Sequence, residues 1–150
     1  ICLNKEENMP RINVPTPETI LYTARIDVQI GDINYGGHLA NDAVLRLCHE
    51  TRVRWLAALG FTELDEGGAG LIMADAAVQY LAQAHHGDAL QIEMGAEEAG
   101  KGGFVLLYHM VRVRDGKTVA RVRTGMVCFD YAAQRVCRLP QALKTVLEAV

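Results

Sequence analysis

The feature that most constrains the fold is a single long helical pattern, residues 41–59, which is followed only by strand patterns until residue 130. Its apolar side chains recur at the spacing of an amphipathic α-helix. The stripe consists of Val44, Cys48, Thr51, Trp55 and Leu59, and it is widened by Leu45, Leu47 and Leu56. Gly60 follows in a position that suits a left-handed cap. We therefore expect one substantially buried helix that ends at Gly60.

Five strand patterns accompany this helix, and a short second helix closes the chain. The strand patterns cover residues 23–30, 71–84, 90–94, 104–114 and 117–130. In the first pattern, Val28 and Ile30 point the same way and alternate with polar residues, as in a half-buried strand. Asp115-Gly116 separates the last two patterns and is typical of a two-residue hairpin turn. The closing helix starts at Pro140, because proline is favoured at the first helical position.

This order of patterns predicts the fold class. A buried helix packed on one curved, mainly antiparallel five-stranded sheet is an α+β arrangement. With 150 residues, the chain is long enough for one domain with a sizeable core. We predict this domain over residues 19–150, preceded by an irregular leader over residues 1–18. Residues 1–8 fit no element, and we interpret them as an added remnant before a natural start at Met9.

Composition excludes several classes of function. The formal net charge is −3, and the arginines form no basic stripe of the kind that binds nucleic acid. No stretch approaches the roughly 20 apolar residues of a membrane span, and no signal peptide is recognisable. The four cysteines lack the spacing of a zinc site. These observations predict a reduced, cytoplasmic protein without a metal or another cofactor.

Residues 31–41 carry the candidate chemistry, because they form a polar, glycine-rich loop between the first strand and the long helix. A loop that leads into a helix N-terminus presents free backbone N–H groups and the positive end of the helix dipole. That arrangement suits a carbonyl oxygen that gains negative charge during a reaction. In the alternative interpretation, Gly36 and Gly37 only permit a tight turn and Asn41 is the N-cap of the helix.

The loop and the order of elements resemble the hot-dog fold, and in particular acyl-CoA thioesterases of the 4-hydroxybenzoyl-CoA thioesterase type. Their pattern, roughly Asp-x-Asp-x-x-Gly-His-Val-Asn-Asn, stands here as Asp32-Ile33-Asn34-Tyr35-Gly36-Gly37-His38-Leu39-Ala40-Asn41. The resemblance covers about residues 23–130. It continues along the helix in Glu50, Arg52, Trp55, Leu56 and Gly60, and in the later turn of His85, Gly87 and Asp88.

The resemblance implies a thioesterase that hydrolyses an acyl-CoA or acyl-carrier-protein thioester with an activated water molecule. It also implies a homodimer or homotetramer, because a single hot-dog sheet leaves its edge strands open. We expect Asp32, Asn34 and His38 to be the catalytic residues. The substrate is expected to contact the remaining polar and glycine positions of the loop, namely Tyr35, Gly36, Gly37 and Asn41.

One residue departs from the family pattern. The family's catalytic aspartate falls on Asn34, and an asparagine can orient water but cannot act as a carboxylate base. Asp32 is the first candidate to replace that carboxylate. Glu50 is the second, although Arg46 and Arg54 at four residues on either side favour a surface ion pair.

Two alternatives to hydrolysis remain open at this point. The run from Gly31 to Asn34, followed by His38, also resembles the signature of hot-dog enoyl-CoA hydratases and dehydratases. Tyr35 stands where that signature has proline, which favours the thioesterase. The other alternative is a binding module for acyl thioesters without catalytic activity, and Asn34 is the residue that supports it.

Overall fold

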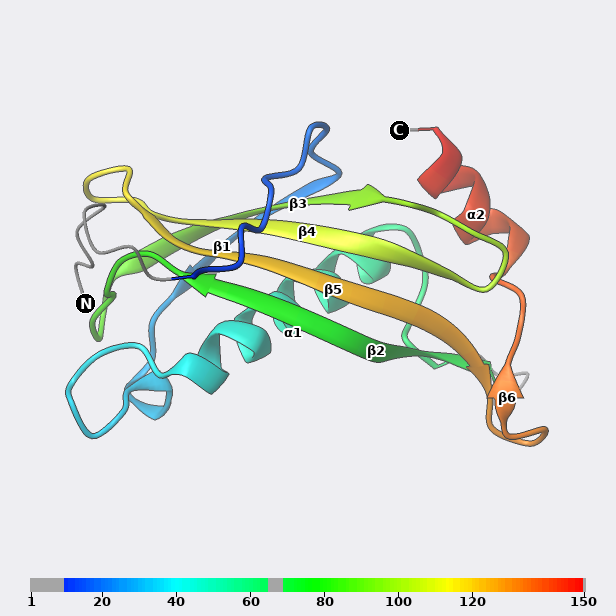
Figure 1. Ribbon diagram of the computed structural model, residues 1–150, viewed down its shortest axis with the longest axis horizontal. Helices are drawn as coiled ribbons and strands as arrows, with labels where there is room; N and C mark the ends of the chain where they lie inside the picture. Colours follow the sequence, from blue (N-terminus) through cyan, green and yellow to red (C-terminus); the bar gives the residue numbers. More distant parts are fainter. Residues whose placement is uncertain (1–9, 65–68, 150) are drawn as a thin grey trace.

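The computed structural model describes residues 10–64 and 69–149, in which one antiparallel sheet curves around a long helix (Figure 1). The helix α1 spans Asn41–Ala58. The strands are β1 (Tyr22–Asp27), β2 (Ala69–Tyr80), β3 (Ala89–Glu97), β4 (Gly103–Arg112), β5 (Thr118–Asp130) and β6 (Arg135–Val136). A 3-10 helix η1 (Ile30–Asp32) and a closing helix α2 (Gln141–Glu148) complete the fold.

The sheet has the strand order β1-β3-β4-β5-β2, and all of its pairings are antiparallel. The predicted α+β hot-dog arrangement is thereby confirmed. The sequence predicted five strands, whereas the sheet has six, because the two-residue strand β6 pairs with the end of β5. A strand that short has too few residues to show an alternating pattern.

The predicted apolar stripe of α1 is confirmed for four of its five residues. Val44, Cys48, Thr51 and Trp55 are buried against the inner face of the sheet. Leu59 is 36% exposed because it lies past the last helical turn, where it forms the C-cap. Around this stripe, the core is filled mainly by apolar residues of β3, β4 and β5, including Ile92, Leu106, Met110 and Val122.

The first strand is shorter than the alternation predicted, and the expectation for Ile30 was wrong. The strand β1 ends at Asp27, Val28 remains buried, and Ile30 is 71% exposed. The chain leaves the sheet because the carboxylate of Asp32 accepts the backbone N–H of Gln29, at 2.9 Å, and closes η1. The apolar side chain of Ile30 is thus carried outward at the start of the candidate loop.

The hairpin between β4 and β5 turns at Asp115-Gly116, as predicted, but its connection is longer than two residues. Gly116 has φ +70, a conformation that favours glycine. The strands already end at Arg112 and begin again at Thr118. The side chain of Arg112 bonds to Asp115 across the turn, which draws the residues between them out of the ladder.

Residues 10–20 contain neither helix nor strand and cross the outer face of the sheet (Figure 1). Val14 is buried there against Val105 and Leu107 in a small second core. Gly95 is required beneath this segment, because a Cβ at that position would collide with the carbonyl oxygen of Thr19. The interpretation of residues 1–8 and the proposed start at Met9 lie outside the described residues.

Candidate functional site

The candidate loop is a compact turn that its own polar groups hold together. The backbone N–H of Gly37 donates to the carbonyl of Asn34 at 3.0 Å, and the N–H of Asn34 donates to the carbonyl of His38 at 2.8 Å. The side-chain oxygen of Asn34 accepts the backbone N–H of His38 at 3.1 Å. Gly37 has φ +82, which explains the glycine at this position. The turn therefore fixes Asn34 and His38 relative to each other.

A pocket of about 560 Å³ lies beside this turn. The loop contributes Asn34, His38 and Asn41 to its wall, and the end of β2 contributes Tyr80. The irregular N-terminal segment contributes Arg11. Three of the predicted site residues are thus brought to one cavity. Among the residues of the described chain that line this pocket, none is an aspartate or glutamate.

Tyr80 closes the helix side of the pocket. Its hydroxyl group donates to the carbonyl oxygen of Asn41 at 2.9 Å. Burial, followed by the negative charge of Asp42, raises the pKa of Tyr80 above its usual value. The phenol therefore stays protonated at neutral pH and remains a hydrogen-bond donor.

The predicted carboxylate, Asp32, does not line this pocket. Its side chain is only 10% exposed, and one oxygen accepts the backbone N–H of Gln29 at 2.9 Å. The other oxygen accepts a hydrogen bond from Arg46 of α1 at 3.2 Å. In this arrangement Asp32 closes η1 and ties the candidate loop to the helix.

The remaining predicted contacts lie on the turn itself rather than in the wall of the pocket. The side chain of Tyr35 is fully exposed at the tip of the loop. A Cβ on Gly36 would lie 3.5 Å from the amide oxygen of Asn34 and from the ring of His38.

Asn41 is the first helical residue, and Ala40 occupies the N-cap. The interpretation of Asn41 as the N-cap was therefore wrong, because the helix starts one residue earlier than that interpretation required.

The second carboxylate candidate, Glu50, lies on the exposed side of α1. Its carboxylate accepts a hydrogen bond from Arg54, one turn further along, at 2.8 Å. Both side chains are more than a third exposed. The geometry is that of the surface ion pair that the arginine spacing indicated.

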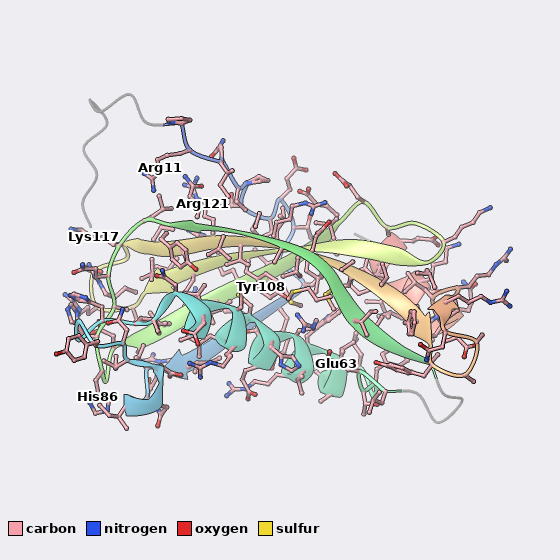
Figure 2. The ribbon with its side chains drawn as sticks, turned by 60° about the horizontal axis from the view of Figure 1, so that its bottom comes forward. Arg11, Glu63, His86, Tyr108, Lys117 and Arg121 are labelled. Carbon is pink, nitrogen blue, oxygen red and sulfur yellow. The ribbon has the colours of Figure 1, made fainter. Side chains whose placement is uncertain are left out.

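The sequence interpretation overlooked a buried polar cluster at the middle of α1. Arg52 is buried, and its guanidinium donates to the hydroxyl of Tyr108 at 3.3 Å. Tyr108 lies in the interior between α1 and the sheet (Figure 2), and burial raises its pKa to about 12. The signal was present, because Arg52 lies four residues from both Cys48 and Leu56 and therefore on the buried stripe.

A second overlooked feature is the contact of His38 with His85. The two imidazole rings meet edge to face, with centroids 5.2 Å apart and an angle of 65° between their planes. The sequence interpretation recognised His85 only as part of a turn that resembles the family's. No local pattern could have paired two residues so far apart in the chain.

Two general searches of the described residues complete the description of the site. Across residues 10–64 and 69–149, no three histidine, cysteine, aspartate or glutamate side chains gather in a way that could hold a metal ion. Neither helix described here is long and apolar enough to cross a membrane.

Comparison with known proteins defines the class of this protein. The sequence profile of the thioesterase-like superfamily matches residues 28–147. The chain belongs to this superfamily, and the predicted class, a thioester hydrolase with the hot-dog fold, is confirmed. This membership favours hydrolysis of an acyl-CoA thioester over the hydratase alternative.

Individual relatives are similar over most of their length. A 1,4-dihydroxy-2-naphthoyl-CoA hydrolase of Synechocystis is 24% identical over 129 residues, which cover 84% of this chain and 94% of the relative. The enzyme of that name from Synechococcus elongatus is 28% identical over 126 residues, covering 81% and 90%. A solved structure of a 1,4-dihydroxy-2-naphthoyl-CoA thioesterase from Synechocystis superposes with a TM-score of 0.80 at 23% identity, covering 86% of this chain and 96% of that one.

Proposed function

We propose that the pocket beside the candidate loop hydrolyses the CoA thioester of an aromatic, fused-ring acyl group. The observation that carries this proposal is the meeting of Asn34, His38 and Asn41 in one pocket of about 560 Å³. A cavity of that volume is within the range of small-molecule sites. The aromatic acyl group is suggested by two relatives named as hydrolases of 1,4-dihydroxy-2-naphthoyl-CoA. CoA is the proposed carrier, and the acyl-carrier-protein substrate remains the alternative.

In the proposed reaction, Asn34 and His38 hold the attacking water. The amide oxygen of Asn34 already accepts one backbone N–H, which leaves its second lone pair and its NH₂ group for water or substrate. The imidazole of His38 accepts a proton from the water as the oxygen attacks the thioester carbonyl. Collapse of the tetrahedral intermediate breaks the carbon–sulfur bond, and the thiolate leaves with that proton. The products are the free acid and CoA.

The start of α1 stabilises the developing oxyanion in this proposal. The first backbone N–H groups of a helix have no intrahelical acceptor, and the helix dipole is positive at that end. Asn41, the first residue of α1, lines the pocket. A carbonyl oxygen placed there would meet backbone donors as its negative charge develops.

Asp32 acts as the anchor of the loop in this proposal, rather than as the base. Its carboxylate already accepts hydrogen bonds from the backbone N–H of Gln29 and from the side chain of Arg46. The proposed role is to keep Asn34 and the following turn in place. Tyr35, Gly36 and Gly37 supply the turn, and the exposed ring of Tyr35 is available to a substrate or to a second subunit.

We further propose a cytoplasmic homodimer, with a homotetramer as the alternative. The strand β2 is an edge of the sheet, and within the described residues no other strand pairs with its outer side. Its central residues are exposed, and its last residue, Tyr80, lines the pocket. A second copy of the chain paired along β2 would cover this edge and approach the pocket.

The experiment that tests the function is a hydrolysis panel. Aromatic and straight-chain acyl-CoA substrates are compared by thiol release, and an enoyl-CoA is followed in parallel for hydration. We expect thiol release, with a higher kcat/KM for fused-ring aromatic acyl groups. Hydration without thiol release would favour the hydratase alternative. Binding without turnover would favour the binding module and would overturn the proposal.

A further inference from the structure

The imidazole of His38 packs against one aromatic ring among the described residues, that of His85. In the described residues, no hydrogen bond or ion pair is made by the ring of His38, and the ring of His85 packs against it edge to face at 5.2 Å. The side chain of His38 is only half-buried. An imidazole without a hydrogen bond can rotate about its side-chain bonds, and packing against a neighbouring ring favours one of its orientations.

The backbone brings the two histidines together. The N–H of Leu39 donates to the carbonyl of Ala84 at 2.8 Å. Leu39 follows His38 and Ala84 precedes His85, so this bond ties the candidate loop to the segment between β2 and β3. The position of the His38 ring therefore depends on how firmly the rest of the fold holds the segment between β2 and β3.

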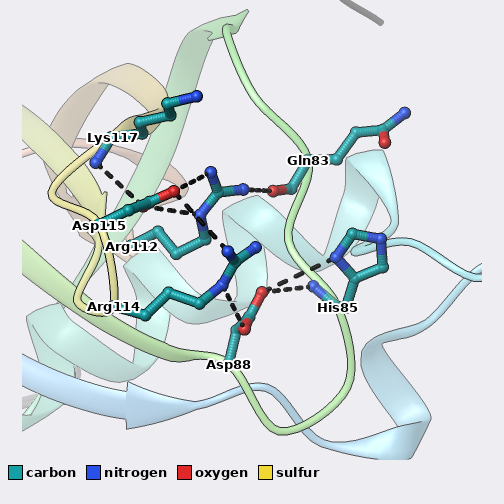
Figure 3. Close-up of polar contacts among 7 residues, drawn as sticks. All are labelled: Gln83, His85, Asp88, Arg112, Arg114, Asp115 and Lys117. Atoms are coloured by element: carbon teal, nitrogen blue, oxygen red, sulfur yellow. Dashed lines mark hydrogen bonds and ion pairs between the residues drawn. The ribbon is translucent and has the colours of Figure 1, made fainter.

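Asp88 holds His85 from the other side of its turn. One carboxylate oxygen of Asp88 accepts the backbone N–H of His85 at 2.9 Å and lies 3.8 Å from its ring nitrogen Nδ1. The other oxygen accepts a hydrogen bond from Arg114 at 3.1 Å (Figure 3). Burial acts to raise the pKa of Asp88, but the hydrogen bonds from His85 and Arg114 outweigh it and lower that pKa. The carboxylate is ionised at neutral pH.

The hairpin between β4 and β5 contacts the segment between β2 and β3 at a second point. Arg112 binds both carboxylate oxygens of Asp115, at 2.9 and 2.5 Å, and also donates to the carbonyl of Gln83 at 2.5 Å (Figure 3). The hairpin thus contacts the segment at Gln83 and at Asp88, on both sides of His85. Arg112 is buried, and a bidentate arginine–carboxylate pair has a defined geometry.

We propose that His85 is a positioning residue for His38, held by the β4–β5 hairpin through Asp88 and Gln83. Its ring fixes the plane in which the His38 imidazole faces the pocket. This inference rests on the proposed function, in which His38 accepts the proton of the attacking water. Neither the superfamily match nor the names of the relatives assign a role to His85.

Three variants test this role in the full chain. His85→Ala removes the ring and is expected to lower kcat about tenfold while KM changes less than about twofold, because misorientation of a proton acceptor affects the chemical step. His85→Phe keeps a flat ring and is expected to restore kcat to within about threefold of the original value. His86→Ala is the matched control, since His86 is exposed at the end of the molecule (Figure 2) and its side chain makes no hydrogen bond, ion pair or ring contact among the described residues.

A readout that does not depend on activity separates this proposal from the proposed function. The ring of His85 displaces the NMR signals of the His38 imidazole by its ring current. We expect these signals to shift in His85→Ala, to remain displaced in His85→Phe and to stay unchanged in His86→Ala. Unchanged His38 signals in His85→Ala, or no rescue of kcat by His85→Phe, would overturn the positioning role. If the His38 signals shift as expected but the original protein releases no thiol, the proposed function fails and the ring contact stands.

Discussion

Asn34 stands where the resembling family carries an aspartate, and this one residue decides how water can be activated. In the structure its amide oxygen accepts the backbone N–H of His38 at 3.1 Å while the residue also lines the pocket. An amide in this place can orient water but cannot take its proton. In the proposed mechanism the proton acceptor is therefore a neighbour, and His38 is the titratable side chain of the loop that lines the pocket.

Substitution of Asn34 tests this reasoning. Asn34→Ala is expected to lower kcat by about 10²-fold, because an oriented polar group at the reacting atoms is lost. Asn34→Asp is expected to keep or raise kcat, since it restores the carboxylate of the family pattern. Both are measured by thiol release, with melting temperature as the folding control. An alanine variant with unchanged turnover would remove Asn34 from the mechanism.

Substitutions of Asp32 and Glu50 distinguish a carboxylate that the site needs from one that only forms a surface ion pair. Asp32→Asn is expected to reduce kcat strongly, and Glu50→Gln, at an exposed ion pair with Arg54, to leave kcat and stability nearly unchanged. Arg46→Gln distinguishes the possible roles of Asp32. If Asp32 anchors the loop through Arg46, this variant also loses turnover. If Asp32 were instead the base, Arg46→Gln would be almost as active as the original protein, which would contradict the anchoring role.

At the scale of elements, the β4–β5 hairpin is more than a connection between two strands. Its side chains Arg112 and Arg114 reach across to the segment between β2 and β3, where they meet Gln83 and Asp88. That segment in turn bonds to the candidate loop through Ala84 and Leu39. The geometry of the pocket therefore depends on a hairpin that contributes no residue to its wall.

The ion pair between Arg112 and Asp115 in the β4–β5 hairpin makes the stability of the fold depend on pH. The hydrogen bonds from Arg112 hold the pKa of Asp115 well below the ordinary aspartate value of 3.8. A carboxyl group with a lowered pKa stabilises the fold fully above its unfolded pKa, and this contribution is lost as pH falls through the folded pKa. We expect Asp115→Asn to lower Tm at pH 7, and the difference from the original protein to shrink below about pH 3.8.

The control for this prediction is Asp27→Asn. Asp27 is exposed, and its side chain makes no hydrogen bond or ion pair among the described residues. It should show little difference in Tm at any pH. A difference for Asp115→Asn that stayed constant from pH 7 to pH 2 would mean that the charge of Asp115 does not contribute.

At the scale of the whole molecule, an open strand edge and several exposed apolar side chains occur on β2 and around the candidate loop. Apart from an isolated bridge of Gly70 with Leu64, the outer edge of β2 pairs with no other part of the described chain, and Met73 on this strand is 45% exposed. Ile30 and Tyr35 project from the loop region with exposed fractions of 71% and 110%. Large apolar side chains that stay exposed near an open strand edge are typical of a surface that a partner covers.

Sedimentation tests the assembly. The chain has a mass of 16.4 kDa, and we expect a species of twice that mass at micromolar concentration. Met73→Lys places a charge on the exposed edge and should shift the equilibrium toward monomer. Val53→Lys, at an exposed position on α1, is the matched control. A monomer in the original protein would contradict the dimer, and a species of four chains would favour the tetramer.

The sequence by itself determined the long helix, the hairpin turn and the order of the elements along the chain, because these follow from local periodicity and turn chemistry. The order of the strands within the sheet came from the tertiary structure. The sequence also indicated the loop from which Asn34 and His38 reach the pocket. The sequence pattern extended the first strand to Ile30, whereas the strand ends at Asp27. Alternation does not show where the Asp32 carboxylate draws the chain into a 3-10 turn.

Only the tertiary structure decided which polar groups meet. It directed Asp32 toward Arg46, packed His38 against His85 and buried Arg52 beside Tyr108. These contacts join residues that are distant in the chain, and their geometry depends on sheet register and loop conformation together. Periodicity reports which face of an element is apolar, but it carries no information on which side chains of two separate loops approach each other.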